Sequence, residues 1–392
     1  MALRAVGGGG SAIGVSPQNN GISNFTVQNT QKLRMGAARI RSGPFVGSTF
    51  KIACIGDSVM NGYDAVSTNS LYPGARPLAI PQLLANVLLN GSRLPAQSDS
   101  WFGNPPTGTA AALMAYDTRL NIINFTTTGF NGPGGAALDS VVNGASIAFT
   151  PASAFDTIDI FYAQQATGGS FTVNVDGGAT LATINTTGAL AYIKQTITGV
   201  ARGTHTINLT TTSTTDTQIN GMAVRDSTIP RAEIYQLSIN GVTAGSYNGV
   251  FSGRGPTLGI PVVAPDVSFI NLTINDINLV NETVAAYTTN LQSIITACAA
   301  SGDVILCIGN PGSEANQTNG VGLGYINAVY ALAAPGGPNG VNGLPVLDFV
   351  VRMVSFAVAN ALSPYYDTNV PSLHPGRIWY ADHAAAMSQF FQ

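Results

Sequence analysis

Lys51-Ile52-Ala53-Cys54-Ile55-Gly56-Asp57-Ser58 is the stretch that decides the fold, because an apolar run ends there abruptly in Gly-Asp-Ser. A short apolar run bounded by glycine is typical of a buried parallel strand. Gly56 allows the chain to turn sharply, so we expect Ser58 to lie near the N-terminus of a following helix, where free N–H groups can hold a developing oxyanion. An isolated Gly-Asp-Ser is also common in ordinary strand-to-loop turns, so a catalytic interpretation needs matching motifs elsewhere.

Matching motifs occur downstream, in Leu-Thr-Ile-Asn-Asp around Asn275 and in Ser-Leu-His-Pro-Gly around His374. Together with Gly-Asp-Ser, they resemble the SGNH (GDSL-type) serine hydrolases, a family that uses Ser, Gly, Asn and His from four blocks in this chain order. The resemblance covers residues 50–64 and 230–390. The nucleophile elbow of the α/β-hydrolases, Gly-x-Ser-x-Gly, is not satisfied, because Met60 occupies the second glycine position.

The resemblance implies a three-layer, flavodoxin-like α/β core with a parallel sheet, and a role for each motif residue. Ser58 would be the nucleophile, His374 the base, and Asn275 an oxyanion donor beside the Ser58 N–H. The family's glycine donor has two candidates, Gly129 and Gly245. We favour Gly245, because it follows a predicted strand close to the Asn275 block.

One position departs from the family pattern. The family has Asp three residues before the histidine, and this chain has Pro371 there. Asp367 could take that role if the loop folds back, or a backbone carbonyl or Ser372 could orient the ring. A Ser–His dyad is also viable, because an oxyanion hole and substrate positioning retain much of the catalysis.

The other two histidines fit structural roles better than a catalytic one. His205 alternates with threonines in a predicted strand, and we expect it at the surface. His383 follows an aspartate in the predicted terminal helix, where a solvated position is expected. His374 is therefore the predicted base.

Between about residues 151 and 228 the pattern changes to short strands separated by turns such as Asp-Gly-Gly, with no helices between them. This pattern predicts an antiparallel β-sandwich, similar to the jelly-roll inserts of some SGNH hydrolases and phage tail enzymes. The strand–helix alternation typical of a parallel sheet resumes after residue 229. The predicted organisation is a flexible arm with a short helix (1–48), a hydrolase core (49–145 and 229–392) and a β-sandwich insert (146–228).

Composition limits the partners. Only 9% of the 392 residues are charged, against about 25% in ordinary soluble proteins. The net charge of −3 argues against a nucleic-acid partner, which needs a basic face. A Thr/Asn/Gly-rich surface suits glycan-facing, extracellular or virion-associated proteins. The three cysteines match neither a zinc site nor a disulfide framework and are expected as small buried residues.

No apolar run is long enough for a membrane span. The first residues lack the apolar core of a secretion signal, so a route out of the cell by lysis or in a virion is expected. The Gly-rich arm could serve virion attachment or homo-oligomer formation.

The sequence thus predicts a serine esterase that hydrolyses O-acyl esters, O-acetyl above all, on a polysaccharide, with no metal and no organic cofactor. The alternative is a non-catalytic glycan-binding or virion structural protein on a degenerate SGNH scaffold.

Overall fold

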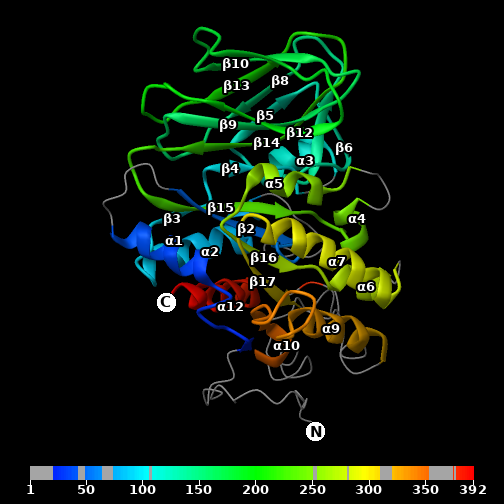
Figure 1. The fold of residues 1–392 in the computed structure, drawn as a ribbon. Coiled ribbons are helices and arrows are strands. Elements are labelled where there is room, and N and C mark those ends of the chain that lie inside the picture. The colour runs from blue at the N-terminus through cyan, green and yellow to red at the C-terminus, as the bar shows by residue number, and fades with distance from the viewer. Residues whose placement is uncertain are drawn as a thin grey trace.

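The computed structural model describes residues 21–42, 49–63, 74–105, 108–249, 254–279, 282–309, 320–352, 374 and 377–392. Figure 1 shows two parts stacked on each other: two antiparallel sheets, and below them a sheet covered by helices on both faces. The predicted arm lies largely outside the described residues. Its short helix is present as α1 (Gln31–Ser42).

The covered sheet is the parallel core that the alternation of strands and helices predicts. Its strands run in the order β1-β18-β17-β16-β2-β15-β3, and all neighbours are parallel except β1 and β18. The strands are β1 (Ile22–Ser23), β2 (Thr49–Gly56), β3 (Ala96–Gln97), β15 (Arg231–Ser238), β16 (Val267–Asn271), β17 (Asp303–Ile308) and β18 (Val346–Asp348).

Residues of β2 alternate between the two faces of this sheet, as the period of a strand requires. Ile52 and Cys54 pack with the helices of one face, and Ala53 and Ile55 pack with those of the other. The first face carries α1, α2 (Ile80–Asn90) and α12 (Arg377–Ser388). The second carries α4 (Ala244–Asn248), α5 (Ile260–Val263), α7 (Val284–Ala299) and α9 (Gly320–Ala333). Cys54, Cys298 and Cys307 are buried and free, as expected.

The two antiparallel sheets enclose a core of their own. Their orders are β11-β10-β13-β8-β5 and β12-β9-β14-β7-β6, and β4 (Trp101–Phe102) also pairs with β14. Side chains from both sheets, including Phe149, Phe171, Ile160 and Met222, share one apolar cluster. The strands are β5 (Leu120–Ile123), β6 (Thr126–Phe130), β7 (Ala136–Ser140), β8 (Ser146–Phe149), β9 (Thr157–Gln164), β10 (Ser170–Val175), β11 (Ala182–Asn185), β12 (Ala191–Ile197), β13 (Ile207–Thr211) and β14 (Thr217–Arg225).

This antiparallel layer begins earlier than the expected boundary at residue 146. β5, β6 and β7 all precede that boundary, yet β5 pairs with β8, β7 pairs with β14, and β6 pairs with β7. These strands have only four or five residues each. The strands that join β5 and β7 to the layer lie farther along the chain, so local periodicity could not reveal them.

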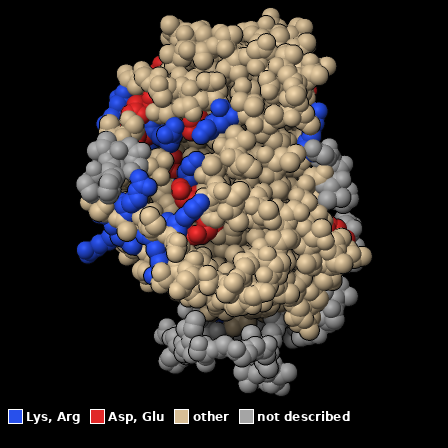
Figure 2. All heavy atoms as spheres, viewed as in Figure 1, with Lys and Arg blue, Asp and Glu red and all other residues tan. Residues whose placement is uncertain are grey.

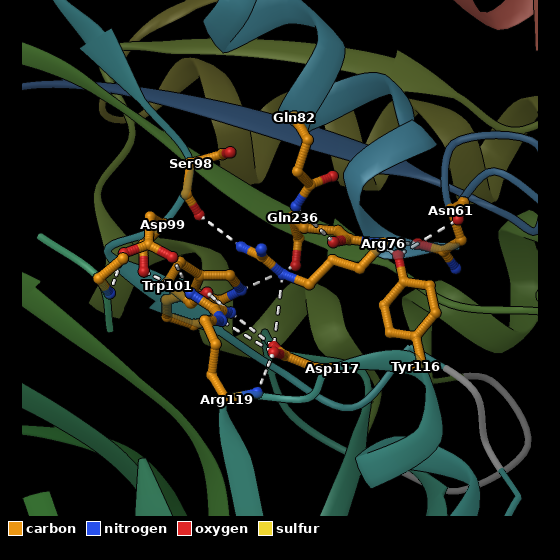
Figure 3. A network of polar contacts seen from close by, with 11 residues as sticks. Asn61, Arg76, Gln82, Ser98, Asp99, Trp101, Tyr116, Asp117, Arg119 and Gln236 are labelled. Carbon is orange, nitrogen blue, oxygen red and sulfur yellow. Dashed lines mark hydrogen bonds and ion pairs between the residues drawn. The ribbon is translucent and has the colours of Figure 1, made fainter. Parts of the chain in front are cut away.

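A buried ion network joins the antiparallel layer to the core (Figure 3). Arg119 binds the Asp117 carboxylate (Nε–Oδ1 2.8 Å) and Asp99 (Nη1–Oδ1 3.1 Å), and Arg76 approaches Asp117 at 3.4 Å. Burial opposes ionisation of Asp117, but the charges and hydrogen bonds of Arg119 and then Arg76 hold its pKa below the usual range. Removing one member would leave a buried charge uncompensated, which typically costs about 3–5 kcal/mol.

Charge is unevenly distributed over the surface. Figure 2 shows Lys and Arg side chains gathered at the junction between the antiparallel layer and the α1 side of the core. Arginines form salt bridges in the pairs Arg225–Asp159 (3.3 Å) and Arg202–Asp226 (2.7 Å). Within the described ranges, no helix is both long and apolar enough to cross a bilayer.

His383 differs from its sequence-based expectation, because it is fully buried rather than solvated. Its ring stacks on Phe349 with centroids 3.5 Å apart, and neither ring nitrogen has a hydrogen-bond partner among the described residues. Burial, with a smaller effect of the Arg352 charge, lowers the pKa of His383 well below its usual value. The expectation rested on the preceding aspartate. Asp382 does lie at the surface side of the helix and binds Arg352, but His383, at the next position, faces the core.

Buried neutral His383 should make the fold sensitive to acid. The unfolded chain binds a proton at this imidazole below about pH 6.5, whereas the folded chain does not. The contribution to stability is therefore complete above that pH and is lost as the pH falls. The free energy of unfolding of wild type should decline relative to His383→Leu by about 1.4 kcal/mol per pH unit.

Urea unfolding at several pH values between 7.5 and 5 measures this difference. His205→Gln is the comparison variant of opposite sign, because the hydrogen bond to Asp176 raises the pKa of His205, so the contribution of His205 to stability is present at low pH and is lost as the pH rises. Parallel curves for wild type and His383→Leu would contradict the prediction.

Candidate active site

The candidate site lies where β2, β15 and β16 end together. In register, Gly56 is paired with Ser238 on one side and Asn271 on the other. A Cβ on Gly56 would lie 2.8 Å from the Met60 Cβ and 3.0 Å from the Asn271 carbonyl oxygen, so only glycine fits. Residues 57–63 form consecutive turns rather than the expected helix start, closed by a Tyr63 N–H bond to the Ser58 carbonyl (3.0 Å).

Ser58 and His374 meet at this edge. The Ser58 Oγ lies 2.8 Å from the His374 Nε2, although the two residues are 316 positions apart. Both are buried, at 4% and 8% exposure. The Tyr63 ring packs against the imidazole with centroids 4.2 Å apart, which restricts its rotation. Asp367, the expected acidic partner, lies outside the described residues, as do Pro371 and Ser372.

Asn275 lies beside the same edge, in the first turn of α6 (Ile274–Leu279) after β16. Its Nδ2 donates to the Val242 carbonyl at 2.9 Å. A primary amide has two N–H donors, so one remains for another acceptor. The side chain therefore borders the loop that connects β15 to α4.

Gly245 is near this loop, but its N–H is already bonded and is not free to bind an oxyanion. It donates to the Glu282 Oε1 at 2.6 Å, and Glu282 is itself held by Asn290 (Nδ2–Oε2 2.7 Å). A carboxylate already occupies the position that an oxyanion would need. Gly129, the other sequence candidate, lies in β6 of the antiparallel layer.

Gly241 is a candidate that the sequence analysis overlooked. It lies three residues after the end of β15, adopts φ +70°, and is exposed. No acceptor among the described residues takes its N–H, and a Cβ there would meet nothing within 4 Å. Asn-Gly immediately after an apolar strand is a recognisable turn signal, and it could have directed attention to Gly241.

Buried carboxyl groups bond the backbone on both sides of the candidate site. Burial, helped by the charges of Glu282 and Asp57, raises the pKa of Asp276 to about 8, although its oxygens accept the Ala244 N–H at 3.0 and 3.2 Å, which lowers it. Burial likewise raises the pKa of Asp57 to about 7; its Oδ1 accepts the Val59 N–H at 2.8 Å. In the described part of the chain, no three His, Cys, Asp or Glu side chains are grouped to hold a metal ion.

Gly245→Ala should destabilise the fold. The new Cβ would lie 2.0 Å from the Glu282 Oε1, so Glu282 would have to leave its buried bonds, at a cost of roughly 1–3 kcal/mol. Gly178→Ala is the control, because its Cβ would meet only the Val175 carbonyl at 3.2 Å, in an exposed turn. Chemical denaturation compares the two, and equal stabilities would refute the tight contact.

Comparison with known proteins agrees with this architecture. No family model and no curated protein matches the chain. Among solved structures, it is similar to a peptidoglycan O-acetylesterase, with a TM-score of 0.63 and 13% identity over 94% of this chain and 97% of that one. At that identity, the likeness shows the fold alone: a parallel α/β core with an additional antiparallel layer, as the sequence predicted.

Two family-two carbohydrate esterases overlap less. One is from Corynascus thermopiles (Myceliophthora fergusii), at 13% identity and a TM-score of 0.30, and covers 69% of this chain and 98% of that one. The other is from Clostridium thermocellum, at 14% identity and a TM-score of 0.28, and covers 69% and 97%. TM-scores this low do not show that these two proteins share the fold of this chain.

Proposed function

We propose that this protein is a serine esterase that removes O-acyl groups, O-acetyl in particular, from a polysaccharide. The observation that carries the proposal is the 2.8 Å contact between the Ser58 Oγ and the His374 Nε2 at the carboxyl edge of a parallel sheet. Open α/β sheets bind their ligands at this edge. A serine becomes nucleophilic when an adjacent base takes its proton.

In the proposed reaction, His374 accepts the Ser58 hydroxyl proton while the Ser58 Oγ attacks the acyl carbonyl carbon. The tetrahedral intermediate collapses when His374 gives this proton to the departing sugar oxygen, which leaves an acyl-serine. His374 then takes a proton from water, and the resulting hydroxide attacks the ester. The carboxylic acid departs, and Ser58 recovers its proton.

The negative charge of each intermediate needs donors that are fixed in advance. The Ser58 N–H, the Asn275 side chain and the Gly241 N–H are the proposed set. Gly241 takes the place expected for Gly245, because the Gly245 N–H is bound to Glu282.

The substrate class has two supports, both weaker than the support for the chemistry. The solved structure that covers nearly the whole chain is named a peptidoglycan O-acetylesterase. The surface is poor in charge and rich in uncharged hydrogen-bonding side chains, which suits a glycan. A polymer of this kind would place the enzyme's work outside the cytoplasm.

Ser58→Ala tests the proposal directly. Turnover of p-nitrophenyl acetate should fall by several orders of magnitude, and labelling by a fluorophosphonate should disappear. The change removes one oxygen, so the free energy of unfolding should change by less than about 1 kcal/mol. Ser170→Ala, which changes a half-buried serine of β10 in the antiparallel layer, should keep full activity.

Wild-type turnover in Ser58→Ala would refute the assignment. A wild-type protein that neither turns over esters nor reacts with the fluorophosphonate would favour the glycan-binding alternative.

Asn275→Ala should separate transition-state binding from substrate binding. Loss of an oxyanion donor should lower kcat by about 10²–10³ with little change in KM. Asn278→Ala is the control on the same helix, because the Asn278 amide bonds the Ile274 carbonyl (2.7 Å) within α6. Steady-state kinetics of both variants measure this, and a rise in KM alone would contradict the proposed role.

A further inference from the structure

The loop of residues 240–242, which presents the Gly241 N–H, is held by three hydrogen bonds from three separate segments. Asn275 bonds the Val242 carbonyl at 2.9 Å, and the Asn61 Nδ2 bonds the Asn240 Oδ1 at 3.0 Å. The Asn240 N–H donates to the carbonyl of Pro105 at 3.0 Å. Only the Asn275 contact comes from the proposed catalytic set.

Asn61 is fully buried, three residues after Ser58, and its side-chain orientation is determined by its neighbours. Its Oδ1 accepts bonds from the Gln236 Nε2 (2.6 Å) and from the Ser238 hydroxyl. With the Gln236 Nε2 and the Ser238 hydroxyl donating to Oδ1, the Asn61 Nδ2 faces Asn240 and donates to its Oδ1.

The same contacts extend into the antiparallel layer (Figure 3). Gln236 also donates to the Tyr116 hydroxyl at 2.7 Å, and that hydroxyl donates to the Asn61 carbonyl at 3.2 Å. Tyr116 ends α3 (Ala110–Tyr116), next to Asp117 of the buried ion network. The Trp101 indole N–H, from β4, bonds the Gln236 carbonyl at 2.9 Å.

We propose that Asn61 is a positioning residue for the oxyanion loop, and that Tyr116 connects this function to the antiparallel layer. The inference rests on the proposed function. In this proposal, the antiparallel layer helps to position the oxyanion loop, in addition to any contact that the layer makes with the substrate.

The physical need for such a support is clear. Gly241 has no side chain to pack, is exposed, and adopts a left-handed conformation. The turn around it is closed by a long bond from the Val242 N–H to the Ile239 carbonyl (3.4 Å), so contacts from outside the loop are needed to fix the direction of the Gly241 N–H. Oxyanion donors are effective only when they are placed before the reaction. A displacement of about 1 Å can cost 10²-fold in rate.

A double-mutant cycle of Asn61→Ala and Asn240→Ala tests the inference. Each single change should lower kcat on p-nitrophenyl acetate by about ten- to hundredfold with KM unchanged. If Asn61 acts through Asn240, the double variant should be no slower than Asn61→Ala. Additive losses, or an unchanged kcat in Asn61→Ala, would overturn the inference.

Tyr116→Phe is a milder second variant, because it removes one oxygen and keeps the ring. It should lower kcat by a few fold. Tyr330→Phe is its control: it removes an equivalent hydroxyl, bonded to the Asp348 Oδ2 at 2.6 Å, at the far side of the sheet. Equal kcat in both variants would show that Tyr116 does not connect the antiparallel layer to the oxyanion loop.

Hydrogen exchange gives a readout that does not depend on turnover. Amide exchange at Asn240 and Val242, whose N–H groups bond the Pro105 and Ile239 carbonyls, should rise in Asn61→Ala, while amides of β17 remain protected. Unchanged exchange in the loop would overturn the inference even if activity fell. A wild type without turnover or fluorophosphonate labelling would instead overturn the proposed function, and the catalytic role of Asn61 with it.

Discussion

The in-register parallel pairing of β2 with β15 and β16 is the constraint on which the rest depends. It aligns Gly56 with Ser238 and Asn271, so the loops that follow these three strands all begin at the same level of the sheet, at its carboxyl edge. Ser58, Gly241 and Asn275 each lie a few residues beyond that level. Their proximity thus follows from backbone hydrogen bonding, and side-chain contacts only refine it. A shift in register of β15 would carry Gly241 away from Ser58 without altering any residue of the site.

The parts of the candidate site that the sequence placed at the sheet edge are those whose signal is local. Ser58 and Asn275 follow apolar strands, and His374 precedes the terminal helix. Gly245 was misplaced because the choice between two nearby glycines depends on Glu282, a residue 37 positions away that binds the Gly245 N–H. The start of the antiparallel layer was missed for a similar reason, since β5 to β7 are defined by distant partners. His383 shows the same limit: an adjacent Asp382 indicates a solvated residue only until tertiary packing is known.

Electrostatics near the site follow from the scarcity of charge. Asp57 and Asp276 are buried close to one another and to Glu282, and the pKa of each aspartate is raised. No cation is recorded in a salt bridge with either aspartate among the described residues, and backbone N–H groups are their partners. Their bonds to backbone N–H groups hold the backbone around Ser58 and α4. The raised pKa of each aspartate reduces the negative charge next to the proposed oxyanion position, where such charge would oppose oxyanion formation.

The order of the strands in the chain also bears on biosynthesis. β2 is an inner strand, buried on both faces, yet its neighbours β15 and β16 are encoded only after the whole antiparallel layer. A ribosome adds about 5–20 residues per second, so the apolar β2 segment would lack its neighbouring strand β15 for roughly 10–35 s. During that interval its unpaired edges could recruit another nascent chain. Holdase chaperones should therefore improve the yield of soluble protein more than faster translation does.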